Sequence, residues 1–576
     1  MRTIDRSLPL ALLLVLATVA PATAATSLPD PMAPGPDVVN RIDYDAGPAL
    51  VGMPGAVYPQ ELNGSVHFPL AVKGPLPVIV FLHGRHASCS YLGVQSLGYP
   101  CPGTAATASV DSYKGYDYMA QNLASHGYVV MSIDANGINT YDTADTDSGA
   151  MARAQTIAKS LDLLAQWNQG AGPGAVDTNF VGRLDLSRIG IMGHSRGGEG
   201  VTQFIAYNRS RPASLDPTVG PDFGPRYPGL KAVFALAPID AASQTPTGVP
   251  LAELLPYCDG DVSDLSGSRP FERTKADAFP RVQYGVNGAD HNYFNTIWTG
   301  DDNTTTTDTA CAASLKGNVR LSKDEEKAIG SVLIPAFLRR FVGPEPAFDP
   351  YVTGAAPLPA RACPATPVPC DQEVQVSYVA PAAARHVVLG PATADPQAAA
   401  ADGGAVTATG LSVFAACTPA NNGTGCPGGG LPTAVDRSTT PQLSLAWDRT
   451  ASLSIALRGA AADASAYATL TLRAAVDYAD ARNPAGVSQD FVVTLVDAHG
   501  KTASVAAAPY ARGALVPSRG SSQREMVLGG IRIPVTRFAG VDLAHLQTLR
   551  LGFGTATAAG SLDLADVAWQ EPAARR

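Results

Sequence analysis

The fold is decided by residues 187–200, which read SRIGIMGHSRGGEG. Ile189 to Met192 form a short apolar run that predicts a buried strand, and Val201 to Tyr207 continue with helical character. Between them stands a Gly-X-Ser-X-Gly pattern centred on Ser195. Glycines flanking a serine permit a turn that is too tight for other side chains. A strand, such a turn and a helix in succession are the context of a nucleophile elbow, in which the serine hydroxyl is exposed at the end of the strand.

Two further apolar runs end beside residues that can do chemistry. Leu76 to Leu82 predict a buried strand followed by His83-Gly84, and Arg281 to Val286 predict another strand shortly before His291. The segment Cys258-Asp259-Gly260-Asp261-Val262 supplies carboxylates between Ser195 and His291. The order Ser, Asp, His along the chain is that of α/β-hydrolases. Residues from about 66 to 342 therefore resemble the α/β-hydrolase superfamily, in its secreted dienelactone-hydrolase, polyester-hydrolase and lipase-like branch.

The resemblance assigns a role to each of these residues. It implies that Ser195 is the nucleophile, that His291 is the general base, and that an aspartate orients the imidazole. Asp261 is the preferred acid, because its segment aligns with the family's G-x-x-D loop with Cys258 at the glycine position. Asp259 remains the alternative, and Asp240, after the preceding strand, is a third option.

The same resemblance implies an oxyanion hole made of the backbone N–H groups of Arg85 and Arg196. His83 is expected to brace its loop through a hydrogen bond rather than to act in catalysis. Three more residues are candidates for contact with substrate, although a structural role explains them equally well: His194, Tyr293 and Trp298. No cofactor is expected, since the triad needs none, and no Cys-x2-Cys or His-x3-His spacing indicates a metal.

Composition limits the protein class. The 576 residues suggest two or three domains, with 45% hydrophobic residues for sizeable cores. A net charge of −9 without a basic stripe argues against nucleic acid as a partner. Residues 1–24 are expected to be a signal peptide, with Arg2 and Arg6, an apolar stretch and Ala22-Thr23-Ala24 before the cleavage point. No later run is long and apolar enough to span a membrane, so the expected location is extracellular or periplasmic.

Eight cysteines fit an oxidising compartment. Their connectivity cannot be deduced from the sequence, but proximity suggests four pairs. These pairs are Cys89–Cys101, Cys258–Cys311, Cys363–Cys370 and Cys417–Cys426. The second pair is predicted to hold the acid loop close to the segment that follows His291.

The residue composition and the pattern of apolar residues divide the chain into segments. Residues 25–61 are rich in Pro, Gly and Asp and predict an irregular leader, and 62–342 alternate strands with helices, as in a mostly parallel, doubly wound α/β sheet. Residues 343–370 predict a Pro-rich linker. Residues 371–576 hold short alternating runs, beginning with Val374 to Tyr378, that predict a β-sandwich or jelly roll. The last 40 residues or so resemble the closing strands of galactose-binding-like jelly rolls.

The sequence thus predicts a secreted serine hydrolase, most simply a carboxylic-ester hydrolase acting on a small-molecule or polymer-borne ester. A peptidase or an acyltransferase on the same fold is the first alternative. A non-catalytic surface or glycan-binding protein is the second. Trp447 and Trp569 could serve a glycan-binding module as sugar platforms, although strand spacing favours a place in the core.

Overall fold

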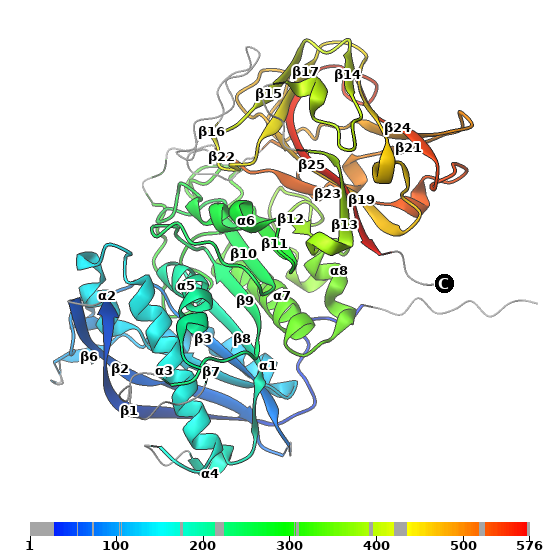
Figure 1. Cartoon of the computed structure of the whole chain (residues 1–576). Coiled ribbons are helices and arrows are strands. Elements are labelled where there is room, and N and C mark those ends of the chain that lie inside the picture. The colour runs from blue at the N-terminus through cyan, green and yellow to red at the C-terminus, as the bar shows by residue number, and fades with distance from the viewer. Residues whose placement is uncertain are drawn as a thin grey trace, which may run out of the picture.

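A computed structural model describes residues 28–572, apart from 54–55, 72–73, 103, 105, 173–176, 214–223, 305, 307–309, 391–394, 420–434 and 518–524. The predicted signal peptide, residues 1–24, lies outside the described residues, as does Cys426 of the fourth predicted cysteine pair. Figure 1 shows two parts, an α/β part drawn from blue to green and an all-β part drawn from yellow to red.

The α/β part is built on a nine-stranded sheet with the order β1-β2-β7-β3-β8-β9-β10-β11-β12. Its centre is parallel from β7 to β11, whereas β1, β2 and β12 run antiparallel to their neighbours at the two edges. The fold class predicted for this part is confirmed. The six parallel strands are β7 (Val129–Ile133), β3 (Leu76–Leu82), β8 (Leu184–His194), β9 (Leu230–Leu236), β10 (Leu251–Pro256) and β11 (Arg281–Val286).

Helices cover both faces of this sheet because its central strands are apolar on both sides. In β3 every residue is buried, and successive residues belong to different cores. Ile79 and Phe81 pack with α1 (Asp117–Ser125) and α7 (Lys323–Phe341). Val78, Val80 and Leu82 pack on the opposite face with α3 (Ala150–Asn168) and α5 (Arg196–Ser210).

The prediction of an irregular leader over residues 25–61 is wrong. β1 (Val39–Met53) and β2 (Ala56–Pro69) form a long antiparallel hairpin that joins the sheet through β7. The turn-forming residues Gly47 and Pro48 that hid this strand lie at a register shift between Asp45 and Pro48. An edge strand tolerates proline and an irregularity there, because no neighbour needs every N–H group.

The predicted boundary of the C-terminal module is also wrong. β12 (Val374–Val379) pairs with β11 and completes the α/β sheet. The Pro-rich segment before it contains α8 (Asp349–Val352) and packs on the same core through Tyr351 and Leu358. An alternating apolar run predicts a strand but carries no information about which sheet it joins, so the sequence assigned β12 to the module that follows.

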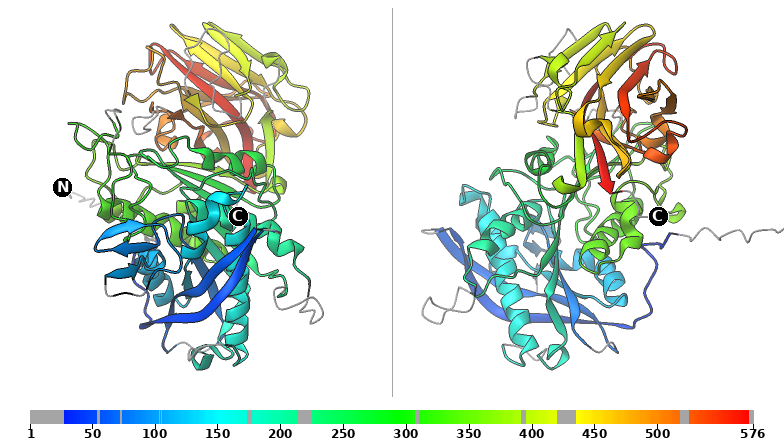
Figure 2. Two further views of the ribbon diagram at one scale, coloured as in Figure 1. Left: turned by 90° about the vertical axis from the view of Figure 1, so that its left-hand side faces the viewer. Right: turned by 45° about the vertical axis from the view of Figure 1, so that its right-hand side comes forward.

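Beyond β12, two antiparallel sheets face each other across one apolar core, as predicted. The views in Figure 2 show this sandwich stacked on one end of the α/β part. Trp447 and Trp569 are fully buried within it, so neither offers a platform to a sugar. One sheet contains β15 (Val413–Cys417), β17 (Gln442–Trp447), β25 (Gly560–Pro572), β19 (Tyr467–Val476), β23 (Gly529–Pro534) and β13 (Arg385–Leu389), and the other contains β14 (Val406–Thr409), β18 (Ala451–Ala456), β24 (Leu546–Phe553), β20 (Val492–Asp497) and β21 (Thr502–Ala506).

A buried group of charges joins the two parts. Arg473, on β19, pairs with Glu272 of α6 (Arg269–Thr274) at 2.5 Å and with Asp566 of β25 at 3.0 Å. Lys275 completes the group with a bond of 2.8 Å to Asp566. The Arg473 and Glu272 side chains are both almost wholly buried. Charges placed so deep need their partners, so this contact fixes the sandwich on the α/β part.

Three of the predicted disulfides are present, namely Cys89–Cys101, Cys258–Cys311 and Cys363–Cys370. In the described part of the chain, no helix combines the length and the apolar character that crossing a bilayer requires.

Candidate active site

Ser195 occupies the turn between β8 and α5, as the sequence predicts. Its backbone has φ 59° and ψ −125°, a conformation that costs energy for a residue with a side chain. The flanking glycines are required by packing. A Cβ on Gly193 would lie 2.1 Å from the carbonyl oxygen of Gly197, and one on Gly197 would lie 2.7 Å from that of His83. The strain and the close approach together indicate a nucleophile elbow.

The loop after β3 lies against this turn. A Cβ on Gly84 would be 2.5 Å from the Ser195 Cβ and 3.2 Å from its Oγ. His83 braces the loop, as expected. Its Nε2 accepts a hydrogen bond from the Ala135 N–H at 2.8 Å, so Nδ1 carries the proton and donates to the Gly84 carbonyl at 2.9 Å. The glycine is therefore held where the backbone can approach the serine.

His291 is buried and its Nδ1 lies 2.7 Å from Asp259 Oδ2. The other oxygen of Asp259 accepts from the backbone N–H groups of Asp261 and Val262, at 2.9 and 2.6 Å, and these bonds hold the carboxylate in place. The neighbouring Asp261 has a side chain that is 63% exposed. Its Oδ2 lies 3.5 Å from His291 Nε2, the nitrogen opposite to the one that an orienting acid contacts. The geometry thus favours Asp259, the alternative, over the preferred Asp261.

Asp240, the third option, belongs to a different contact. It forms a two-pronged ion pair with Arg273, at 2.5 and 2.8 Å.

His291 Nε2 is buried and, within the described residues, has no hydrogen-bond partner. His194, the residue before Ser195, fixes the position of the His291 loop. Its Nε2 lies 2.8 Å from the His291 carbonyl oxygen, and its Nδ1 lies 3.0 Å from the Tyr116 hydroxyl. Since a carbonyl only accepts, Nε2 must donate and Nδ1 must accept from the tyrosine. The elbow and the histidine loop are therefore joined by a direct hydrogen bond.

The two histidines differ in their ionisation. Burial, with the adjacent charge of His291, lowers the pKa of His194 well below its usual range, which agrees with a neutral ring. Burial also opposes protonation of His291, but the charge and hydrogen bond of Asp259, with the charge of Asp261, outweigh it and raise its pKa. An imidazole with a raised pKa holds its proton to higher pH, and it can act as a base only in its neutral form.

The two predicted oxyanion-hole residues lie on the two segments that contact Ser195. Arg196 is the first residue of α5, where backbone N–H groups have no partner within the helix. Arg85 directly follows Gly84. The helix N-terminus adds a positive electrostatic potential at this point.

The three candidate contact residues differ in exposure. His194 is fully buried with both ring nitrogens engaged, and Trp298 is 1% exposed. Trp298 stacks on His86, with 5.0 Å between ring centroids, and also contacts His194. His194 and Trp298 are therefore packing residues, buried within the protein. Tyr293 is partly exposed, with the Lys323 ammonium 5.3 Å from its ring centroid.

Two groups of side chains bring potential cation ligands together. One is Asp259, His291 and Asp302, and the other is Asp290, Asp301 and Asp302. Arg320 contacts both Asp290 and Asp301 and neutralises part of the second group. Burial and its acidic neighbours raise the pKa of Asp302.

Sequence reasoning missed two side chains near the site. Tyr116, which orients His194, stands before α1 in a segment with no catalytic motif. Asp142 follows α2 (Asn136–Tyr141) and contacts the side chains of Arg85 and Arg196. No local pattern signals either residue, because their importance arises only when distant segments meet.

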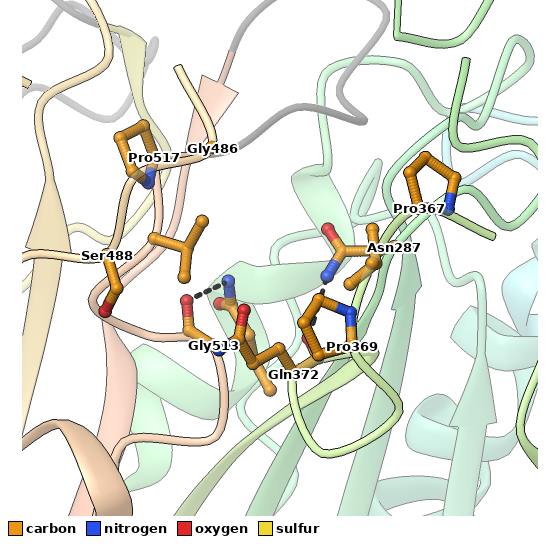
Figure 3. Close-up of a pocket in the computed structure, with 11 residues that line it drawn as sticks. Asn287, Pro367, Pro369, Gln372, Gly486, Ser488, Gly513 and Pro517 are labelled. Atoms are coloured by element: carbon orange, nitrogen blue, oxygen red, sulfur yellow. Dashed lines mark hydrogen bonds between the residues drawn. The ribbon is translucent and has the colours of Figure 1, made fainter. Parts of the chain in front are cut away.

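A separate cavity of about 250 Å³ opens where the α/β part meets the sandwich (Figure 3). Asn287 lines one side and Ser488 the other, Gln372 and Gly513 lie next to each other between them, and proline rings line both sides. None of the triad candidates lines it.

Comparison with known proteins bears on the segment that holds the elbow. Residues 70–220 match the family described as PET hydrolase-like. This segment includes Ser195 and ends before Asp259 and His291. Residues 70–220 of the α/β part are therefore similar to this family, and the match does not extend to the sandwich.

Individual relatives agree. Cutinase 2 of Thermobifida cellulosilytica is 26% identical over 179 residues, which cover 30% of this chain and 53% of the relative. Bis(hydroxyethyl) terephthalate hydrolase of Streptomyces coelicolor is 28% identical over 176 residues, covering 30% and 44%. The match spans about half the length of these relatives. It supports distant kinship with ester hydrolases.

Proposed function

We propose that the protein is an exported serine hydrolase that cleaves carboxylic esters through Ser195, His291 and Asp259. One observation carries the proposal. A serine on a strained elbow is joined through its neighbour His194 to a buried histidine, whose Nδ1 is held by a carboxylate and whose Nε2 makes no hydrogen bond within the described residues. The similarity to cutinases and to a terephthalate-ester hydrolase favours an ester over an amide as the substrate.

The proposed reaction begins when His291 Nε2 accepts the proton of the Ser195 hydroxyl. The serine oxygen attacks the ester carbonyl carbon and forms a tetrahedral intermediate. Its oxyanion accepts hydrogen bonds from the backbone N–H groups of Arg196 and Arg85, each worth about 3 kcal/mol in the transition state. The intermediate collapses, and the alcohol leaves with the proton from His291.

The second half of the proposed reaction releases the acid. Water loses a proton to His291 Nε2 and attacks the acyl-enzyme, and Ser195 leaves with that proton. Asp259 keeps the proton of the imidazole on Nδ1 and stabilises the ring when it is charged. This chemistry needs no cofactor. The disulfides agree with export into an oxidising compartment, which is part of the proposal.

Labelling by a fluorophosphonate probe tests the proposal. We expect the probe to modify the protein at Ser195 and the Ser195→Ala variant to remain unlabelled and inactive on p-nitrophenyl esters from acetate to palmitate. Ser210→Ala is the matched control, since Ser210 is an exposed serine at the end of the same helix. Labelling that persists in Ser195→Ala, or ester hydrolysis unaffected by it, contradicts the proposal.

A further inference from the structure

One buried carboxylate, that of Asp142, receives three guanidinium groups. Arg153 Nη2 lies 2.8 Å from its Oδ2, and Arg85 Nε and Arg196 Nη1 lie 3.2 and 3.0 Å from its Oδ1. The Asp142 and Arg153 side chains are fully buried, whereas the side chains of Arg85 and Arg196 are 31% and 23% exposed. The cluster therefore has a buried anchor and two partly exposed arginine side chains.

Three arginines contact one carboxylate directly in this cluster. Asp145 and Asp147, which follow it in the chain, add negative charge nearby, but their oxygens bind other groups. Asp145 accepts from the Tyr58 hydroxyl at 2.7 Å, and Asp147 accepts from backbone N–H groups at the start of α3. Among the described residues, Arg85 and Arg196 have no side-chain partner besides Asp142. Donors of both guanidiniums thus remain available to a ligand.

The position of the two arginines relates them to the reacting ester. Arg196 follows the nucleophile, and Arg85 follows the glycine whose backbone lies against Ser195. Their backbone N–H groups are the donors proposed for the carbonyl oxygen of the acyl group. The two residues proposed as backbone donors thus each carry a cationic side chain, and Asp142 contacts both of these side chains. Arginine binds carboxylates with a planar, two-pronged geometry.

We infer that Arg85 and Arg196 form an anion subsite for a carboxylate on the acyl part of the substrate. The favoured substrate class is then the half-ester of a short dicarboxylic acid. This inference rests on the proposed function and adds the substrate class to it. Asp142 serves the subsite by holding both side chains at the site entrance and neutralising part of their mutual repulsion.

The test compares two esters that differ by one charge. The p-nitrophenyl half-ester of glutaric acid carries a free carboxylate, and its methyl ester is neutral and almost the same shape. The readout is the ratio of kcat/KM for the charged ester to kcat/KM for the neutral one. We expect Arg85→Gln and Arg196→Gln each to lower this ratio about tenfold, the loss typical of one charge-assisted hydrogen bond. Arg85→Lys keeps the positive charge, so it should retain part of the preference for the charged ester.

Two controls separate the subsite from general effects. Arg188→Gln removes a half-exposed arginine that pairs with Asp185 elsewhere in β8, and should leave the ratio unchanged. Added salt should lower kcat/KM for the charged ester alone, since ions screen exposed charges. Circular dichroism and the melting temperature establish that each variant is folded.

The outcomes distinguish this inference from the proposed function. If the wild type hydrolyses the neutral ester through Ser195 but the ratio is unchanged in both glutamine variants, the subsite is refuted and the ester hydrolase stands. If neither ester is hydrolysed and the probe does not label Ser195, both are refuted.

Discussion

His194 Nε2 donates a hydrogen bond of 2.8 Å to the backbone carbonyl of His291, so the residue before the nucleophile positions the loop of the base. We expect His194→Phe to lower kcat about 10- to 100-fold, because the carbonyl and the Tyr116 hydroxyl both lose their buried partner and the base shifts. Steady-state kinetics on a p-nitrophenyl ester measures this. His194→Gln, which can still donate to the carbonyl, should recover much of the rate. Equal losses in both variants would contradict the positioning role.

The choice between the two aspartates is tested by removing each carboxylate. Asp259→Asn should lower kcat by about 10⁴-fold, because the amide favours the wrong tautomer of His291 while preserving shape. Asp261→Asn should change kcat by less than about tenfold, since that side chain is largely exposed and faces the other ring nitrogen. Steady-state kinetics on one neutral ester at a fixed alkaline pH gives kcat for the wild type and for both variants. The reverse order of effects would restore Asp261 as the acid.

The pH dependence of the rate reports the charge around His291. Its neutral form is the base, and its pKa is raised, so kcat/KM should increase with pH through a midpoint above the ordinary histidine value of about 6.5. Asp261→Asn removes a negative charge 3.5 Å from Nε2 and should move this midpoint to lower pH by roughly half a unit to one unit. Asp264→Asn, at a half-exposed aspartate of the same loop, should leave it in place. A midpoint unmoved by Asp261→Asn would refute this electrostatic account.

Short-range patterns predicted those parts of the site that depend on local geometry. The elbow requires two glycines around Ser195, and β3 and β8 are continuous apolar runs, so sequence alone placed them. The sequence could not separate the two candidate acids, because Asp259 and Asp261 are two residues apart in one loop. Their orientations are set by backbone N–H groups that fold back onto Asp259, a turn that the family's spacing did not indicate.

Long-range pairing explains the remaining differences. β12 was placed in the wrong module because its partner, β11, lies almost 90 residues earlier in the chain. The β1–β2 hairpin was hidden by Gly47 and Pro48, which break the strand pattern at a register shift. Asp142 gains its importance only where the loops after β3, α2 and β8 meet. Periodicity along the chain contains none of this information.

A buried carboxyl on an interior strand of the sheet should make stability depend on pH. Glu253, in β10, is fully buried, and burial raises its pKa well above the usual range. The folded state therefore keeps a proton that the unfolded state loses near pH 4.5, so its contribution to stability decreases as the pH rises above that value. Glu253→Gln removes this dependence. Relative to the wild type, the variant should gain up to about 1.4 kcal/mol of unfolding free energy per pH unit.

Urea unfolding of the wild type and Glu253→Gln at pH 5, 6.5 and 8 measures this gain. Asp324→Asn is the control, since Asp324 is exposed and Lys327 lowers its pKa. The Asp324 carboxyl is then ionised in both the folded and the unfolded wild type over this pH range. The difference in unfolding free energy between the wild type and Asp324→Asn should therefore stay constant. A constant difference for Glu253→Gln as well would show that the buried carboxyl is ionised in the folded protein.

The charged contact between the two parts should be costly to disrupt from one side. Arg473→Met leaves Glu272 without its 2.5 Å partner and weakens the balance around Asp566. Removing one member of a buried ion pair typically costs 3–5 kcal/mol, so we expect a loss of roughly that size in unfolding free energy. In the double variant Arg473→Met, Glu272→Leu, calorimetry should show that most of the lost unfolding free energy is regained. The reason is that no unpaired glutamate is then buried. Lys327→Met, at an exposed pair with Asp324, should cost less than about 1 kcal/mol. A loss that small for Arg473→Met would mean that water reaches the contact and that the sandwich is not fixed by it.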